Sequence, residues 1–199
     1  DEAETLTIRL WDTLLQAAVD LRYTLFSQHP ALARSARLVN QGDQSLHLTH
    51  AMSLCLDLPD SDYEFVHFSG AWARERWMKV RPLEQGIQSV ESARGTSSHN
   101  HNPFIMLRRP GTDEDAGEVI GFSLIYSGNF LAQAEVDTWN TTRVTLGINP
   151  FGFDWKLDPG EVFQTPEAVM VYSDQGMNAM SRTFHRLYRS RLARGQWRD

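Results

Sequence analysis

Aromatic and charged side chains crowd together in the segment Ser69–Trp77 (SGAWARERW), which has the residue types needed to bind a sugar. Trp72 follows a Gly-Ala pair and precedes three charged residues, Arg74–Arg76. Burying this indole would bury the adjacent charges with it, which is costly. An indole displayed at a chain bend offers a flat apolar surface that matches the apolar face of a sugar ring. The segment therefore predicts that Trp72 contacts a carbohydrate, and core packing is the alternative.

Other residues of catalytic type lack the partners that their chemistry needs. His99 and His101 would share one face of a strand and could bind a metal, but no third ligand follows in Asn102–Met106. A polar loop held by hydrogen bonds is the favoured interpretation, and no metal site is predicted. Cys55 lies in the alternating run Ser53–Asp57, where we expect a small buried hydrophobic residue rather than a nucleophile.

Paired carboxylates are the groups on which glycoside hydrolysis depends. A retaining glycosidase needs two carboxyl groups about 5–5.5 Å apart, one as nucleophile and one as acid/base. Asp57, Asp60 and Asp62 cluster around a proline, which is typical of a solvated turn. Asp154 and Asp158 flank a tryptophan just before a Pro-Gly turn. Neither group has the pattern of a catalytic pair, so no catalytic residue is assigned.

Composition limits the class of protein. The 199 residues are 41% hydrophobic, enough for one sizeable core, and 22% are charged with a net charge of −6. That acidic balance disfavours nucleic-acid binding, and no apolar run approaches the ~18 residues that a membrane helix needs. A single cysteine excludes an intramolecular disulfide and favours a reducing cytoplasm. The chain begins almost directly in a strand, which suggests a piece cut from a longer polypeptide.

Alternating apolar and polar residues predict about a dozen strands, and therefore a large all-β antiparallel sandwich. We expect a hairpin turn at residues 40–43. The expected strands are Thr5–Leu10, Leu15–Phe26, Ala33–Asn40, Leu46–Leu54, Tyr63–Phe68, Arg74–Val80, Gly86–Ser92, Phe104–Arg108, Val119–Tyr126, Phe130–Val136, Arg143–Ile148 and Val162–Tyr172.

The pattern changes to a helical period after Ser173, with Asp174 as the expected N-cap and Gly195 as the expected stop. One face of this helix is apolar, formed by Met177, Met180, Phe184, Leu187, Tyr188 and Leu192. The predicted helix also carries six arginines: Arg182, Arg186, Arg189, Arg191, Arg194 and Arg198. They indicate either a solvated face or a surface that docks against an acidic neighbouring domain.

Eight motifs, taken together and in order, resemble the N-terminal β-supersandwich domain of the α-galactosidases of glycoside hydrolase family 36. They are Ser69–Arg76, Gly86–Ser92, Gly95–Phe104, Tyr126–Ala132, Gly147–Phe151, Phe163–Glu167, Tyr172–Gly176 and His185–Arg189. The resemblance implies a galactose-mutarotase-like supersandwich over residues 1–173, lacking the first strands of that domain. It implies that residues 174–199 are a helix and linker toward a (β/α)8 catalytic barrel outside this chain.

The same resemblance implies a function for the longer protein. Members of the family remove terminal α-1,6-linked galactose from melibiose and raffinose-type sugars with retention, through two barrel Asp residues, and need no metal or organic cofactor. By the match of motifs, Trp72 corresponds to a supersandwich Trp that lines the galactose site. Many members are tetramers. We therefore expect a non-catalytic segment, and the alternatives are a free-standing carbohydrate-binding module or a purely structural, oligomerising domain.

Overall fold

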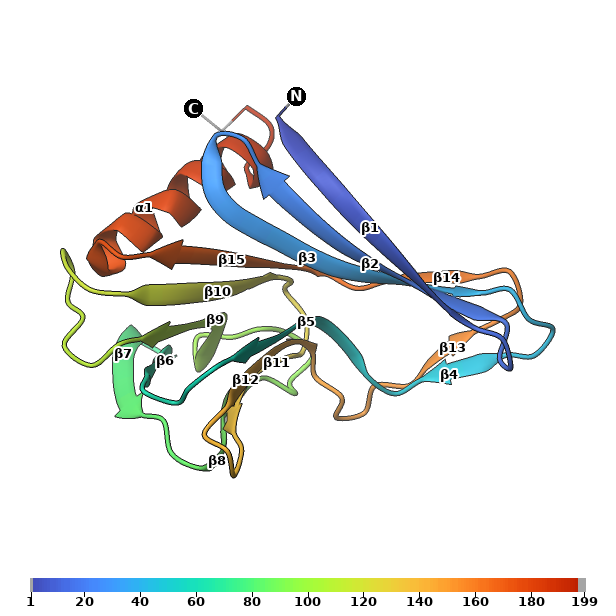
Figure 1. Ribbon diagram of the computed structural model, residues 1–199, viewed down its shortest axis with the longest axis horizontal. Coiled ribbons are helices and arrows are strands. Elements are labelled where there is room, and N and C mark those ends of the chain that lie inside the picture. Colours follow the sequence, from blue (N-terminus) through green and yellow to red (C-terminus); the bar gives the residue numbers. More distant parts are fainter. Residues whose placement is uncertain (1, 197–199) are drawn as a thin grey trace.

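The computed structural model describes residues 2–196, which form two antiparallel sheets packed face to face and one helix at the C-terminal end (Figure 1). The larger sheet has nine strands, ordered β1 (Ala3–Asp12), β2 (Ala17–Phe26), β3 (His29–Asn40), β15 (Glu167–Ser173), β10 (Val119–Ile125), β9 (His101–Arg108), β6 (Glu64–Ala71) and β7 (Arg74–Pro82), with β14 (Val162–Gln164) also paired to β3. The smaller sheet is β5 (Ala51–Leu58), β12 (Thr142–Ile148), β11 (Phe130–Val136) and β8 (Gly86–Glu91). A short ribbon pairs β13 (Trp155–Leu157) with β4 (Leu46–Leu48). The predicted all-β antiparallel sandwich with one C-terminal helix is confirmed.

The space between the two sheets is filled by the inward half of each alternating strand. Phe65, Phe122, Phe130 and Leu146 are completely buried there. Because side chains alternate across a strand, the same residues that give the period-two pattern form this core.

The helix α1 (Gly176–Leu187) covers the opposite face of the larger sheet, and a π-helical turn (Tyr188–Leu192) follows it. Met180 and Phe184 of the helix pack closely over Gly121 of β10. A Cβ atom at Gly121 would lie 2.6 Å from the Met180 sulfur and 2.7 Å from the Phe184 ring. The glycine therefore sets how closely the helix approaches the sheet.

The start of the helix differs from the prediction that Asp174 caps it. The helix begins at Gly176, and no side chain caps it. The backbone N–H groups of Met177 and Asn178 instead donate to the carbonyls of Asp113 and Glu114 in the β9–β10 loop. Because that loop already satisfies the free N–H groups, a capping side chain is not required.

The end of the helix also differs from the prediction. Gly195 has the left-handed φ of 85°, but it follows the capping residue Ala193 by two positions. Leu192, expected on the apolar face, is half exposed, whereas Phe184 and Leu187 are buried. Arg198 lies outside the described residues.

The expected hairpin at residues 40–43 is wrong. Strand β3 pairs with β2, β15 and β14, whereas β4 pairs with β13. Asn40 explains the difference, since its buried side chain donates to the carbonyls of Gln44 and Leu157 and accepts from Gly42. These bonds direct the chain toward β13 rather than back along β3.

Three predicted strands differ in extent from the observed ones. The strand expected over Leu46–Leu54 is divided into β4 and β5, which belong to different sheets. The strand expected from Leu15 begins at Ala17, because Asp12 accepts the N–H groups of Leu14 and Leu15 in a turn that ends at Gln16 with a φ of 50°. The strand expected over 162–172 is divided into β14 and β15 around a proline, which has no N–H to continue a ladder.

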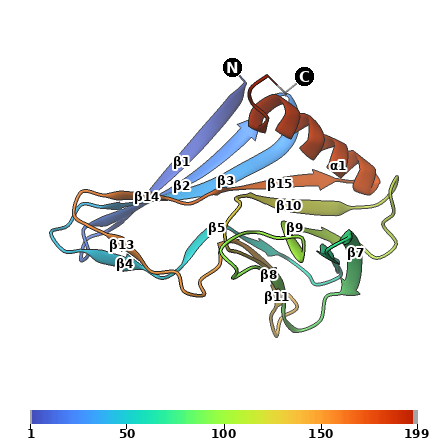
Figure 2. The same cartoon turned by 180° about the vertical axis from the view of Figure 1, so that it is seen from behind.

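Strands β1, β2 and β3 extend beyond the smaller sheet, as both views show (Figure 1 and Figure 2). Leu6, Ile8 and Leu10 share one face of β1 and are exposed by 61%, 42% and 51%. Within residues 2–196 this apolar face has no covering layer. No helix in the same range has the length and apolar character to cross a membrane.

We expect Phe184→Ala to lower the free energy of unfolding by about 3–5 kcal/mol, because it removes a fully buried ring from the contact between helix and sheet. The exposed Arg186, two residues along, provides the control, and Arg186→Ala should change stability by less than about 0.5 kcal/mol. Urea denaturation of both variants measures the difference. Equal effects would show that the helix face is not part of the core.

Candidate sugar-binding hairpin and its supporting loops

Trp72 lies at the tip of the tight hairpin that joins β6 to β7, and 86% of its surface is exposed. Ala71 pairs with Arg74 across the turn, which leaves Trp72 and Ala73 as the two turn residues. The prediction of an indole at a chain bend is therefore confirmed as geometry, and Trp72 does not pack in the core of this chain. Trp139, at the tip of the β11–β12 hairpin, is equally exposed at 85%.

The Trp72 hairpin has an unusual backbone. Ala73 and Arg76 adopt φ values of 62° and 60°, a region that L-residues other than glycine seldom occupy. The β6–β7 register also shifts between Ser69 and Ala71. Strained backbone of this kind is concentrated at functional sites, where the surrounding structure holds it.

Gly70 is required at the base of the hairpin. A Cβ atom there would lie 2.7 Å from the Glu75 Cα and 2.9 Å from the carbonyl oxygens of Arg74 and His99. The Gly70 N–H donates to the Asn100 carbonyl at 3.1 Å. The glycine therefore lets β7 and the β8–β9 loop approach β6 from two sides.

Ser69 holds two histidines on the inner face of the larger sheet. Its Oγ lies 3.0 Å from Nδ1 of His67 and 3.1 Å from Nδ1 of His101. One hydroxyl proton serves both contacts when the two imidazoles are neutral and have opposite tautomers, so that Ser69 donates to one ring and accepts from the other. Burial, reinforced by the charge of Arg81, lowers the pKa of His67 to about 4. Burial also lowers the pKa of His101.

The loops behind the hairpin form a continuous hydrogen-bonded rim. Gly95 donates to the Asn129 side chain at 2.6 Å, and Ser97 donates to the Ser127 carbonyl at 2.7 Å. The buried Asn149 then joins this pair of loops through a backbone bond to the Asn129 carbonyl. Four motifs separated in sequence, around residues 72, 97, 128 and 149, thus meet at one end of the sandwich.

Two hollows border this part of the molecule. One of about 570 Å³ is lined by Glu91, Ala93, Leu131, Asn149, Pro150 and Phe151. The other, of about 650 Å³, lies between α1 and the ends of β6, β7 and β9, and Arg76 and Met78 form part of its wall. Trp72 lines neither of the two. The Trp72 indole is therefore a projecting contact surface, whereas Arg76 of the same hairpin lines the larger hollow.

Two of the three carboxylates predicted to lie in a solvated turn are bound by arginines, and for one of them the turn prediction is wrong, because Asp57 lies in strand β5. Arg143 donates two bonds to Asp57 at 2.7 and 2.9 Å and lowers the pKa of that carboxyl. Arg109 binds Asp60 at 2.6 and 3.0 Å, with the same effect on the Asp60 pKa. A carboxyl whose pKa is lowered in this way is a poor proton donor near neutral pH.

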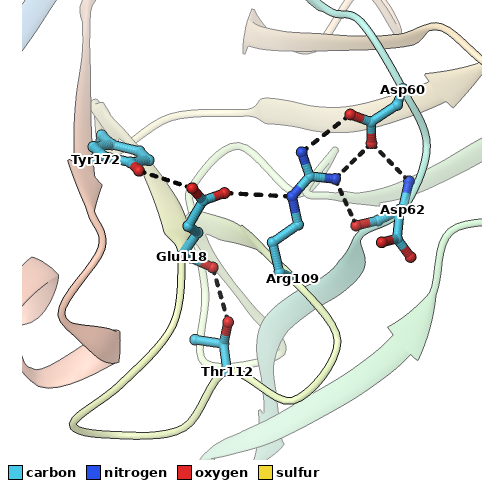
Figure 3. Close-up of polar contacts among 6 residues, drawn as sticks. All are labelled: Asp60, Asp62, Arg109, Thr112, Glu118 and Tyr172. Carbon is cyan, nitrogen blue, oxygen red and sulfur yellow. Dashed lines mark hydrogen bonds and ion pairs between the residues drawn. The ribbon is translucent and has the colours of Figure 1, made fainter.

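Arg109 is the centre of a network that joins three elements (Figure 3). Its guanidinium lies between Asp60 and Glu118 and stacks 4.0 Å from the centre of the Tyr63 ring. Glu118 also accepts from the Tyr172 hydroxyl at 3.2 Å. The network ties the β5–β6 connection to the β9–β10 loop and to β15. Sequence patterns did not identify it, because its members are up to 112 positions apart.

The other residues that the sequence analysis considered for catalysis or metal binding have different surroundings in the structure. His47 bonds Asp154 at 2.7 Å on the surface, and Lys156 pairs with Asp158. The described residues contain no cluster of three metal-binding side chains. The prediction that Cys55 is buried is wrong: it is exposed, because Leu54 and Leu56 occupy the inward positions of β5.

Comparison with protein families gives two matches along the chain. The family model described as the glycosyl hydrolase family 36 N-terminal domain matches residues 1–158. The model described as Melibiase matches residues 162–199.

Individual relatives agree with the family models. The chain is 57% identical to alpha-galactosidase AgaA of Geobacillus stearothermophilus and 43% identical to alpha-galactosidase Mel36A of Lactobacillus acidophilus, and each match covers all of this chain. It spans only 27% of the length of either relative. Among solved structures, a variant of AgaA in complex with stachyose superposes with a TM-score of 0.97 at 57% identity, covering 100% of this chain and 28% of that one. The galactosidase domain of the alpha-galactosidase–sucrose kinase AgaSK superposes with a TM-score of 0.96 at 37% identity, covering 99% and 27%.

The pair of histidines predicts a specific pH dependence of stability. Because the pKa of folded His67 is about 4 and that of an unfolded histidine is about 6.5, the unfolded state binds more protons between these values. Acidification from pH 6.5 to 4 should therefore lower stability, by up to about 1.4 kcal/mol per pH unit from this group. The loss ends below pH 4, where both states are protonated.

Denaturation at several pH values tests this expectation, and His67→Phe should flatten the dependence in that window. An NMR titration of the wild-type protein provides a measurement that does not depend on the variant folding. A His67 ring that titrates near 6.5 would contradict the prediction.

Proposed function

Because the chain belongs to the glycosyl hydrolase family 36 N-terminal domain family, we propose that it is the non-catalytic N-terminal segment of a retaining α-galactosidase. The longer enzyme would hydrolyse terminal α-1,6-linked galactose in sugars such as melibiose and raffinose. Relatives named alpha-galactosidase, and AgaA variants solved with stachyose and raffinose, support this substrate class. Within the segment, the exposed Trp72 hairpin carries the proposal of a sugar contact.

The proposal assigns a structural role to this segment and catalysis to the rest of the polypeptide. Four acidic side chains of the type that catalysis would need are paired with arginine, lysine or histidine: Asp57, Asp60, Asp154 and Asp158. Such pairing suits a structural role rather than proton transfer. The two catalytic carboxylates would come from a (β/α)8 barrel that follows the helix and linker of residues 174–199. Residues 1–173 would form the sandwich that positions Trp72 at the edge of the sugar pocket.

The apolar face of β1 supports a role in assembly as well. Leu6, Ile8 and Leu10 form a row of exposed apolar side chains on β1, the edge strand of the larger sheet, and an exposed edge strand is a surface on which another chain can pair. We propose that the whole enzyme is a homo-oligomer, a tetramer, to which this segment contributes surface. An exposed free thiol at Cys55 fits a reducing cytoplasm, where such a group is not oxidised.

A second candidate function is supported by two exposed indoles at separate hairpin tips, Trp72 and Trp139. A free-standing carbohydrate-binding module would use such surfaces to bind galactosides without a barrel. Calorimetry of this chain with melibiose distinguishes the two, because only the module would release heat of binding at millimolar sugar.

Trp72→Ala in the whole enzyme should lower kcat/KM for raffinose about tenfold for every 1.36 kcal/mol of lost contact energy. Stability should be unchanged, since the side chain is exposed. Trp139→Ala is the matched control, because that indole is equally exposed and lies on another hairpin. Steady-state kinetics with identical kcat/KM values for wild type and Trp72→Ala would reject the sugar contact and leave a purely structural role.

The purified 199-residue chain should not hydrolyse an aryl α-galactoside. The reason is that the proposed nucleophile and acid/base lie outside it. A chromogenic assay at high protein concentration tests this. Turnover above the uncatalysed rate would contradict the proposal that the catalytic residues lie outside this segment.

A further inference from the structure

We propose that Glu75 is a positioning residue that fixes the turn from which Trp72 projects. Its carboxylate oxygen accepts the N–H of Ala73 at 3.0 Å, directly beside the indole-bearing residue. Where the effect on sugar is concerned, this inference rests on the proposed function of Trp72. The effect on the indole itself is independent of any sugar.

The Trp72 side chain depends on this turn because no hydrogen-bonding or aromatic partner in the described part of the chain fixes it. Within residues 2–196 no hydrogen bond or aromatic contact involves its indole, and the residue is 86% exposed. The backbone of Trp72 and Ala73 therefore sets the position and direction of the Cα–Cβ bond of Trp72, and with them the space that the indole can reach. A change in that backbone would move the indole without disturbing the core.

The backbone at Ala73 needs an external constraint. Its φ of 62° is disfavoured for a residue with a Cβ atom, so the turn would relax if it were free to do so. The bond from the Ala73 N–H to the Glu75 carboxylate is charge-assisted and closes a short ring around the strained residue. Asp, Asn and Ser side chains form comparable local bonds in other turns.

Glu75 is itself held in place on its other side. Its Cα packs against Gly70, where a Cβ atom would lie only 2.7 Å away. The N–H of Gly70 is bonded to the Asn100 carbonyl, so the base of the hairpin is tied to the rim of loops. Glu75 thus transmits the fixed position of Gly70 to the turn at Ala73.

Flanking charges do not provide the same function. Arg74 and Arg76 have side chains that only donate, and the group to be satisfied is a backbone donor. A glutamine at position 75 would keep an acceptor oxygen at the same distance from the backbone. The comparison of Glu75→Gln with Glu75→Ala therefore separates the hydrogen bond from the charge.

The test uses the full-length protein labelled with 5-fluorotryptophan, in which the ¹⁹F resonance of Trp72 is assigned by its loss in Trp72→Phe. Glu75→Ala should shift or broaden this resonance and leave those of the other tryptophans unchanged. Glu75→Gln should resemble the wild type, and so should Glu84→Ala, which removes an exposed carboxylate from the β7–β8 loop. A Trp72 resonance that is the same in Glu75→Ala and in the wild type would overturn the proposal, as would an equal change in all tryptophans.

Kinetics add a second measurement that separates this inference from the proposed function. Glu75→Ala should raise KM for raffinose roughly three- to tenfold with little change in kcat, and Glu75→Gln should restore it. If the resonance of Trp72 responds but KM does not, the positioning role stands and the sugar contact of Trp72 is rejected. If KM rises while the resonance is unchanged, Glu75 acts by another route and the positioning role is rejected.

Discussion

Strand β6 is the element on which the candidate site depends, and it contributes both to the core between the two sheets and to the core between the larger sheet and the helix. Its alternating side chains place Phe65 and His67 toward the smaller sheet and Val66 and Phe68 toward the helix. Its end, at Gly70, carries the hairpin. One strand therefore fixes the spacing of three layers, and a one-residue shift in its register would exchange the two faces. The polar pair His67 and Ser69 occurs only where the sandwich core ends, which is how a buried hydrogen-bonded group can coexist with an apolar filling.

Cations and carboxylates in this chain secure connections rather than perform chemistry. Arg109 satisfies Asp60 and Glu118 at once, and Arg143 satisfies Asp57 across the β5–β12 pair. These pairs are partly solvated, so each contributes modestly to stability. The Arg109 pairs hold the β5–β6 connection against the β9–β10 loop, whereas Arg143 and Asp57 lie opposite each other on two paired strands. The same pairing lowers the pKa of the carboxyls of Asp57 and Asp60 and removes them from acid/base catalysis. The carboxylates of Asp57 and Asp60 therefore stabilise the fold and are poorly suited to proton transfer.

Much of this arrangement follows from local patterns. Period two predicts nearly every strand, and the Gly-Ala-Trp sequence predicts an exposed indole at a bend because its neighbours are charged. Features set by distant partners could not be predicted. The pairing of Ser69 with His101 needs β6 beside β9, and the burial of Asn40 needs the carbonyl of Leu157. The exposure of Cys55 follows from which face of β5 meets the core, which alternation alone does not determine.

Under the proposed function, a strained hairpin presents Trp72 to a sugar that is bound mainly by residues outside this chain. A flexible loop would lose conformational entropy on each binding event, and that loss offsets the gain from stacking. The strain at Ala73 and Arg76 is instead balanced during folding, by Gly70, by Glu75 and by the rim of loops behind them. A large sandwich with rigid antiparallel pairing supplies enough stability to hold such a turn.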